Sequence, residues 1–206
     1  MGRRFFSCTT PNERARIRVL EIGCGSCSNL WMVAREGFEA HGIDLSSEAI
    51  ELGHRMMAHW GVSGELKVGS MTELPYPDES MDVVLDVFSS YCLPETDFRQ
   101  CLAEVVRVLK PGGLFFSYSP SMASDAFRNH APARKIDEYT LGGILRTTSP
   151  YFGNDHPFRF ISPDHYQEVL TACGLVMTDC ERVGRSYRQM QEYFEFVVIT
   201  ASRGSN

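Results

Sequence analysis

Alternating apolar and polar segments divide most of the chain into short strands and amphipathic helices. Apolar runs typical of buried strands occupy residues 17–22, 38–44, 65–69, 82–87 and 114–118. Apolar residues at helical spacing, bounded by capping and stop residues, predict helices at 30–36, 48–60, 98–109 and 162–173. Because strand and helix alternate through five strands, the pattern predicts a parallel sheet with helices on both faces.

The alternation changes after residue 118. Residues 119–162 are mixed and rich in Pro, Tyr and His, and such a long segment in a compact domain usually carries function or its own helices. Two further apolar runs, 175–183 and 193–201, are expected to pair as an antiparallel hairpin at the end of the sheet. We therefore predict a single domain over residues 1–206, with 119–162 as a substrate-side insertion or lid.

Composition narrows the class of protein. The 206 residues are enough for one sizeable core, and 43% of them are hydrophobic. The formal net charge of −6, with no run of Lys or Arg, argues against nucleic-acid binding as the main task. No apolar run reaches the length that crosses a membrane, and the N-terminus has no secretory apolar region, so we expect a cytoplasmic protein without a membrane span.

A glycine turn after the first strand is the candidate binding site. Gly23 and Gly25 lack a Cβ, so the chain can bend sharply and admit a ligand beside the backbone. Asp44 ends the second strand, nineteen residues after Gly25, where a carboxylate can accept hydrogen bonds from ribose hydroxyls. Glu21, just before the turn, is interpreted as a ligand contact more readily than as a buried structural acid. These positions predict a nucleoside-containing cofactor.

The cysteines add little to this picture. There are seven, scattered along the chain, which favours reduced thiols in a cytoplasmic protein. Cys24 and Cys27 form a C-x-x-C, but no second pair stands at zinc spacing and both lie in the glycine turn. We therefore predict no metal site.

Four stretches, in order, resemble the class I S-adenosylmethionine-dependent methyltransferases, and among them the small-molecule group that includes the quinone-biosynthesis methyltransferases. They are Val-Leu-Glu-Ile-Gly-Cys-Gly at 19–25, Gly-Ile-Asp-Leu-Ser at 42–46, Leu-Pro-Tyr-Pro-Asp-Glu-Ser-Met-Asp-Val-Val at 74–84 and Glu-Val-Val-Arg-Val-Leu-Lys-Pro-Gly-Gly at 104–113. The resemblance implies an α/β, doubly wound, Rossmann-like fold with a mostly parallel seven-stranded sheet and a C-terminal antiparallel strand. It also implies S-adenosyl-L-methionine as the cofactor and a small molecule as the methyl acceptor.

The resemblance assigns a role to each part of the candidate site. The methionine end of the cofactor would be held by Glu21 and by the backbone that includes Gly23, Cys24 and Gly25. Asp44 would take the ribose hydroxyls, and Leu45 would pack on the adenine. The adenine edge would meet Ser70 and Met71, and the sulfonium would lie beside Asp86 and Val87.

Four positions depart from the family pattern. Cys27 replaces the third glycine of the loop, and Ser70 stands where many relatives carry an acidic residue. Tyr91 and Cys92 occupy the places of two histidines found in many quinone-type relatives, so the quinone substrate does not follow.

The expected reaction is in-line displacement of a methyl group from a positive sulfur by an acceptor atom. A base is needed only where that atom carries a proton of high pKa. Tyr91 and His156 are the candidates, although His156 lies in a polar turn typical of a surface loop. The aromatic residues Tyr151, Phe152, Phe158 and Phe160 could line an acceptor pocket or form the core beneath the insertion.

Two other functions remain open at this point. A non-catalytic S-adenosylmethionine-binding protein would keep the same loop and the same fold. An NAD-dependent oxidoreductase would also use a glycine-rich turn followed by Asp44, but Glu21 and the Pro-Gly-Gly turn at 111–113 favour the methyltransferase.

Overall fold

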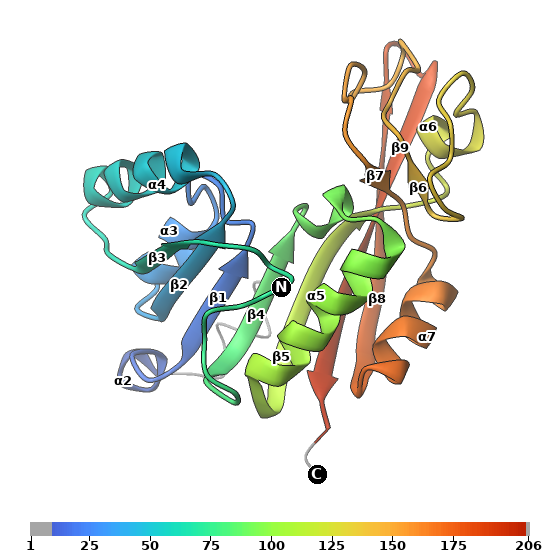
Figure 1. The fold of residues 1–206 in the computed structure, drawn as a ribbon. Helices are drawn as coiled ribbons and strands as arrows, with labels where there is room; N and C mark the ends of the chain where they lie inside the picture. Colours follow the sequence, from blue (N-terminus) through green and yellow to red (C-terminus); the bar gives the residue numbers. More distant parts are fainter. Residues whose placement is uncertain (1–9, 205–206) are drawn as a thin grey trace.

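The computed structural model describes residues 10–204, which form a seven-stranded sheet flanked by helices (Figure 1). The strand order is β3-β2-β1-β4-β5-β9-β8. The strands are β1 (Arg18–Ile22), β2 (Glu39–Asp44), β3 (Glu65–Val68), β4 (Met81–Val87), β5 (Leu109–Pro120), β8 (Leu175–Tyr187) and β9 (Glu192–Arg203). Only β9 runs against the others, pairing antiparallel with β5 and with β8. The predicted α/β fold and C-terminal hairpin are confirmed.

The four predicted helices begin and end close to their predicted positions, as α3 (Leu30–Arg35), α4 (Ser47–His59), α5 (Glu95–Val108) and α7 (Pro163–Ala172). Three short helices were not predicted, α2 (Pro11–Arg14), η1 (Ser90–Cys92) and α6 (Asp125–Arg128). Ser46 caps α4 by accepting a hydrogen bond from the Ala49 amide at 3.1 Å, as its serine signal predicted. The sequence pattern assigns no helix or strand before residue 17. Residues 1–9 of that segment lie outside the described residues.

The core lies on both faces of the sheet. Leu20 and Ile22 of β1 pack with the apolar sides of α5 and α7, which cover one face in Figure 1. Val19, their neighbour in the strand, packs with Phe38 on the opposite side. Continuous apolar strands are needed where helices and loops bury a parallel sheet from both sides.

The insertion forms a small lobe beyond the sheet. It carries α6 and a two-stranded antiparallel sheet of β6 (Thr140–Leu141) and β7 (Phe158–Arg159). Figure 1 shows these elements gathered around the far ends of β8 and β9. Phe158 and Phe160 are fully buried there with Phe194, so they belong to the core beneath the insertion. Within residues 10–204, no helix has the length and apolar content to cross a membrane.

Candidate functional site

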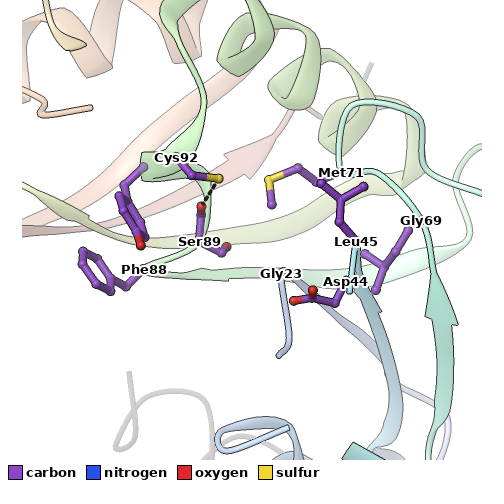
Figure 2. Close-up of a pocket in the computed structure, with 10 residues that line it drawn as sticks. Gly23, Asp44, Leu45, Gly69, Met71, Phe88, Ser89 and Cys92 are labelled. Carbon is purple, nitrogen blue, oxygen red and sulfur yellow. Dashed lines mark hydrogen bonds between the residues drawn. The ribbon is translucent and has the colours of Figure 1, made fainter. Parts of the chain in front are cut away.

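A cavity of about 240 Å³ opens at the carboxyl ends of β1, β2 and β4 (Figure 2). This is the edge at which open parallel sheets bind their ligands. The cavity is lined by Gly23, Ile43, Asp44, Leu45, Gly69, Met71, Phe88, Ser89, Tyr91 and Cys92. In Figure 2 the segment after β4 forms one wall, and the loops after β2 and β3 form the other.

Gly23 is required where β1 meets the segment after β4. Its φ is +61°, and a Cβ added there would stand 2.4 Å from the Ser89 Cβ. Ser89 cannot easily retreat, because its hydroxyl lies 2.7 Å from the Ile22 carbonyl oxygen and 2.7 Å from the Asp86 carboxylate. A side chain at position 23 would therefore be strained and would close the cavity.

Asp44 is held at the cavity by backbone amides. One carboxylate oxygen accepts from the Gly25 amide at 2.9 Å, and the other accepts from the Ser46 amide at 2.9 Å. A carboxylate has about four acceptor positions, so both oxygens keep capacity for hydroxyl donors from the cavity. Leu45, at the rim, is 69% exposed, which suits an apolar side chain that is covered only when a flat ligand binds.

Glu21 lies behind Gly23 and is almost fully buried. One carboxylate oxygen accepts from the Asn29 side-chain amide at 2.9 Å, whereas the other has no hydrogen-bond partner among the described residues. Burial raises the pKa of Glu21 to about 7, opposed by hydrogen bonds from Asn29 and from the Leu30 amide. A buried acceptor without a partner beside the glycine turn suits a positively charged ligand group.

The remaining loop residues brace the cavity. The Cys24 amide donates to the Ile43 carbonyl at 3.0 Å, and the Gly25 amide is used by Asp44, so both are engaged within the fold. Cys27 has a φ of 64°, the left-handed conformation that the family's third glycine would favour. The described cysteines are free thiols, and Cys8 lies outside the described residues.

Six predicted cofactor contacts are absent from the cavity lining: Glu21, Cys24 and Gly25, described above, and Ser70, Asp86 and Val87. The Ser70 hydroxyl lies 2.7 Å from that of Thr72, and Val87 packs against the apolar cluster around Val83. Asp86 is fully buried, and its carboxylate accepts hydrogen bonds from the residues that follow β4. The position of Asp86 at the end of an apolar run gave no sign that serines after β4 would surround its carboxylate.

Phe88 and Tyr91 form the aromatic wall of the cavity. Their rings stack with centroids 4.2 Å apart, and Phe88 holds a left-handed φ of 55°, which is strained for a bulky residue. Burial raises the pKa of Tyr91, so the phenol keeps its proton more firmly than a free tyrosine. Tyr91 therefore offers the cavity an apolar ring and a hydroxyl donor.

The structure does not bring His156 to the cavity. Its side chain is 78% exposed in the polar turn, 3.3 Å from the equally exposed Asp155. Sequence reasoning had missed Phe88, Ser89, Cys92 and Gly69 as lining residues. The signal for the first two was their position directly after β4, beside the cofactor strand.

The sheet order and the cavity at its carboxyl edge define a Rossmann-like α/β domain. Residues 19–113 match the family model described as a methyltransferase domain. These 95 residues, a little under half of the chain, are thus similar to a methyltransferase domain. The dependence on S-adenosylmethionine and the quinone-biosynthesis subgroup stay predictions.

Curated and solved methyltransferases show the same similarity. The chain is 42% identical over 103 residues to the phthiotriol/phenolphthiotriol dimycocerosates methyltransferase of Mycobacterium tuberculosis, covering 48% of this chain and 36% of that protein. It is 41% identical over 100 residues to the fatty-acid O-methyltransferase of Mycolicibacterium smegmatis, covering 48% and 35%. The matches thus span about a third of the relatives' own length.

A solved S-adenosylmethionine-dependent methyltransferase from Methanosarcina mazei has the same fold. Its TM-score is 0.75, with 23% identity, covering 92% of this chain and 93% of that one. At this identity the likeness concerns the fold alone.

Proposed function

We propose that the protein methylates a small apolar molecule, using S-adenosylmethionine and in-line displacement by an acceptor atom. The observation that carries the proposal is the two-sided cavity. One side offers Asp44 and the glycine turn, and the other offers the stacked rings of Phe88 and Tyr91.

The polar side of the cavity has a carboxylate for each end of the proposed cofactor. Asp44 would accept hydrogen bonds from the two ribose hydroxyls, since both of its oxygens are oriented by backbone amides. The unpartnered oxygen of Glu21 would accept from the ammonium group of the methionine end. Gly23, Cys24 and Gly25 would shape the passage between these ends, and Leu45 would cover the adenine. Bound S-adenosylmethionine supplies a methyl group on a positively charged sulfur.

The loop after β3 and the end of β4 complete the proposed cofactor site. Met71 lines the cavity and would contact the adenine edge, with Ser70 placing the loop through Thr72. Val87 and Asp86 would support the wall nearest the sulfur from behind rather than touch the ligand.

The aromatic side suits an apolar acceptor. Phe88 and Tyr91 exclude water and would align the acceptor, which is where such an enzyme gains most of its rate. Both relatives named above are, by their names, lipid methyltransferases. We therefore place a lipid-like acceptor ahead of a quinone, and we assign residues 119–162 as the lobe that encloses it.

Binding and transfer are tested separately. Calorimetry should detect S-adenosylhomocysteine and S-adenosylmethionine but not NAD. Replacing Asp44 with alanine should weaken S-adenosylhomocysteine about 10- to 100-fold, the loss of hydrogen bonds to a charged group. The control D155A removes an exposed carboxylate outside the cavity and should bind as wild type.

Transfer of labelled methyl is then measured with palmitic acid, a sterol and a simple phenol as acceptors. The proposed cofactor site would be overturned if the protein bound NAD but neither S-adenosylmethionine nor S-adenosylhomocysteine. It would also be overturned if D44A bound S-adenosylhomocysteine as tightly as wild type. Cofactor binding without transfer to any of these acceptors would favour the non-catalytic alternative.

A further inference from the structure

The outer end of the insertion lobe exposes large apolar side chains. It consists of the loop 144–154 and the segment 184–191, which ends β8 and turns into β9, and we call these two segments the tip. Figure 1 shows the far ends of β8 and β9, with the loops beside them, standing beyond the rest of the sheet. Leu145 is 47% exposed, Phe152 54% and Met190 85%. Apolar side chains gathered at one end of a protein, rather than scattered singly, indicate a contact surface.

Side-chain contacts hold the two segments of the tip together. The fully buried carboxylate of Glu192 accepts hydrogen bonds from the Arg146 Nε and from the Thr148 hydroxyl, each at 2.6 Å. The Arg188 Nε donates to the Thr148 carbonyl oxygen at 3.2 Å. The loop and the turn therefore form one surface, although about forty residues separate them in the chain.

The tip is basic in a chain that is acidic as a whole. Its two segments contain none of the 26 Asp and Glu residues of the chain, whose formal net charge is −6. They contain three arginines: Arg146, Arg185 and Arg188. Glu192 neutralises Arg146, whereas Arg185 and Arg188 are exposed. The next acids along the chain, Asp155 and Glu181, lie outside the two segments. An anionic surface is thus attracted to the tip and repelled by most of the remaining protein, which sets one orientation of approach.

Exposed apolar side chains beside arginines fit the surface of a lipid bilayer. The apolar groups can enter the boundary between headgroups and acyl chains, while guanidinium groups stay among anionic headgroups. The turn also projects its apolar residue: Arg188, Gln189 and Met190 have successive left-handed φ values of 49°, 56° and 68°. We propose that the tip docks on an anionic bilayer, with Leu145, Phe152 and Met190 entering its surface.

The docked loop also reaches the cavity. Tyr151, the neighbour of the exposed Phe152, has its ring centroid 5.1 Å from that of Phe88, which lines the cavity. An acceptor leaving the bilayer would therefore pass along the loop to the aromatic wall with little exposure to water. This consequence deepens the proposed function and rests on it for the lipid-like acceptor, whereas docking itself rests on the tip alone.

The test is flotation of the full chain with lipid vesicles. Wild type should bind vesicles made of phosphatidylglycerol and phosphatidylcholine in equal parts, and bind phosphatidylcholine vesicles at least about tenfold more weakly. Binding should fall as sodium chloride is added, because salt screens exposed charges. F152S/M190S removes two apolar contacts and should weaken binding at least about tenfold. R185Q/R188Q should weaken it about fivefold for each arginine removed.

The matched control is L52S/R55Q on α4. It replaces an apolar side chain that is 42% exposed and an exposed arginine, beside β3 at the opposite edge of the sheet from β8. It should bind vesicles as wild type. Because the replaced side chains of the tip variants are exposed, urea unfolding should show that both variants remain folded.

The proposal would be overturned if wild type bound neither kind of vesicle, bound both equally, or lost no more binding in the tip variants than in the control. Self-association abolished by F152S/M190S, without vesicle binding, would assign the tip to a second copy of the chain and would also overturn it. Calorimetry with S-adenosylhomocysteine, without vesicles, should give wild-type affinity in both tip variants. Vesicle binding by a wild-type protein that does not bind S-adenosylhomocysteine would support docking while refuting the proposed cofactor site.

Discussion

The buried carboxylate of Glu21 makes a quantitative prediction about pH. Its pKa is raised from an ordinary value of 4.5 to about 7, chiefly by burial. At 1.36 kcal/mol per pH unit, this difference corresponds to about 3 kcal/mol. The raised pKa means that the folded state disfavours the ionised form. The stability that Glu21 contributes is therefore complete below pH 4.5 and is lost as the pH rises through 7.

Replacing Glu21 with glutamine removes this titration and keeps the shape. The free energy of unfolding of E21Q relative to wild type should rise by about 3 kcal/mol between pH 4 and pH 8. Urea unfolding of both proteins across this range measures the difference, in which the titrations common to both cancel. E51Q, an exposed carboxamide substitution on α4, is the matched control and should follow wild type at every pH.

Cofactor binding should show the opposite trend with pH. If the ammonium group of S-adenosylhomocysteine pairs with Glu21, only the ionised carboxylate binds it well. With a pKa of about 7, wild-type affinity should be about tenfold higher at pH 8 than at pH 6. Affinity of E21Q should be weaker and flat across that range. Parallel pH profiles for the two proteins would refute the assignment of Glu21 to the methionine end.

Two further predictions concern the walls of the cavity. G23A should lower the free energy of unfolding by about 2–4 kcal/mol, because the new Cβ meets Ser89. It should also weaken the binding of S-adenosylhomocysteine more than tenfold. The control G61A has a φ of +66° but open space around the new Cβ, so it should cost only the strain of a left-handed backbone, about 1–2 kcal/mol. Unfolding and calorimetry compare them, and equal costs would contradict the steric argument. Y91F should keep kcat within tenfold of wild type for any acceptor found. Burial raises the pKa of Tyr91, so the phenol stays protonated and does not accept the proton of the acceptor. A loss of more than a hundredfold in its steady-state kinetics would mark the phenol as catalytic.

The parts predicted well from the sequence are those whose cause is local. β1, the glycine turn and α3 follow from an apolar run, from two missing side chains and from apolar residues at helical spacing, all close together in the chain. Asp44 reaches the cavity because β2 is parallel to β1 and ends beside it, with Ile22 and Ile43 in register. Parallel pairing alone brings the carboxyl ends of strands to one edge, so an acid at that end could be predicted as a ligand contact.

The parts that could not be predicted depend on contacts between distant segments. Asp86 follows an apolar run just as Asp44 does, yet Ser117 on the neighbouring strand and the two serines after β4 bury it. Phe158 belongs to the core because β8 and β9 extend beyond the sheet and bring Phe194 to it, 6.4 Å between ring centroids. Pattern along one segment carries no information about either partner, so the aromatic residues remained ambiguous.

The two sides of the cavity also differ in how far they depend on contacts between distant segments, and so in how sensitive they are to substitutions elsewhere. Asp44 and Gly23 are oriented by backbone hydrogen bonds and by chain direction, which side-chain substitutions elsewhere leave in place. Tyr91 instead has ring contacts with Phe88 after β4 and with Phe158 of β7. Because those groups come from the insertion as well as from the sheet, substitutions in residues 119–162 can reshape the acceptor side while the cofactor side keeps its geometry. We therefore expect substitutions in the lobe to change which acceptor is used, and substitutions at the ends of the sheet strands to change cofactor binding.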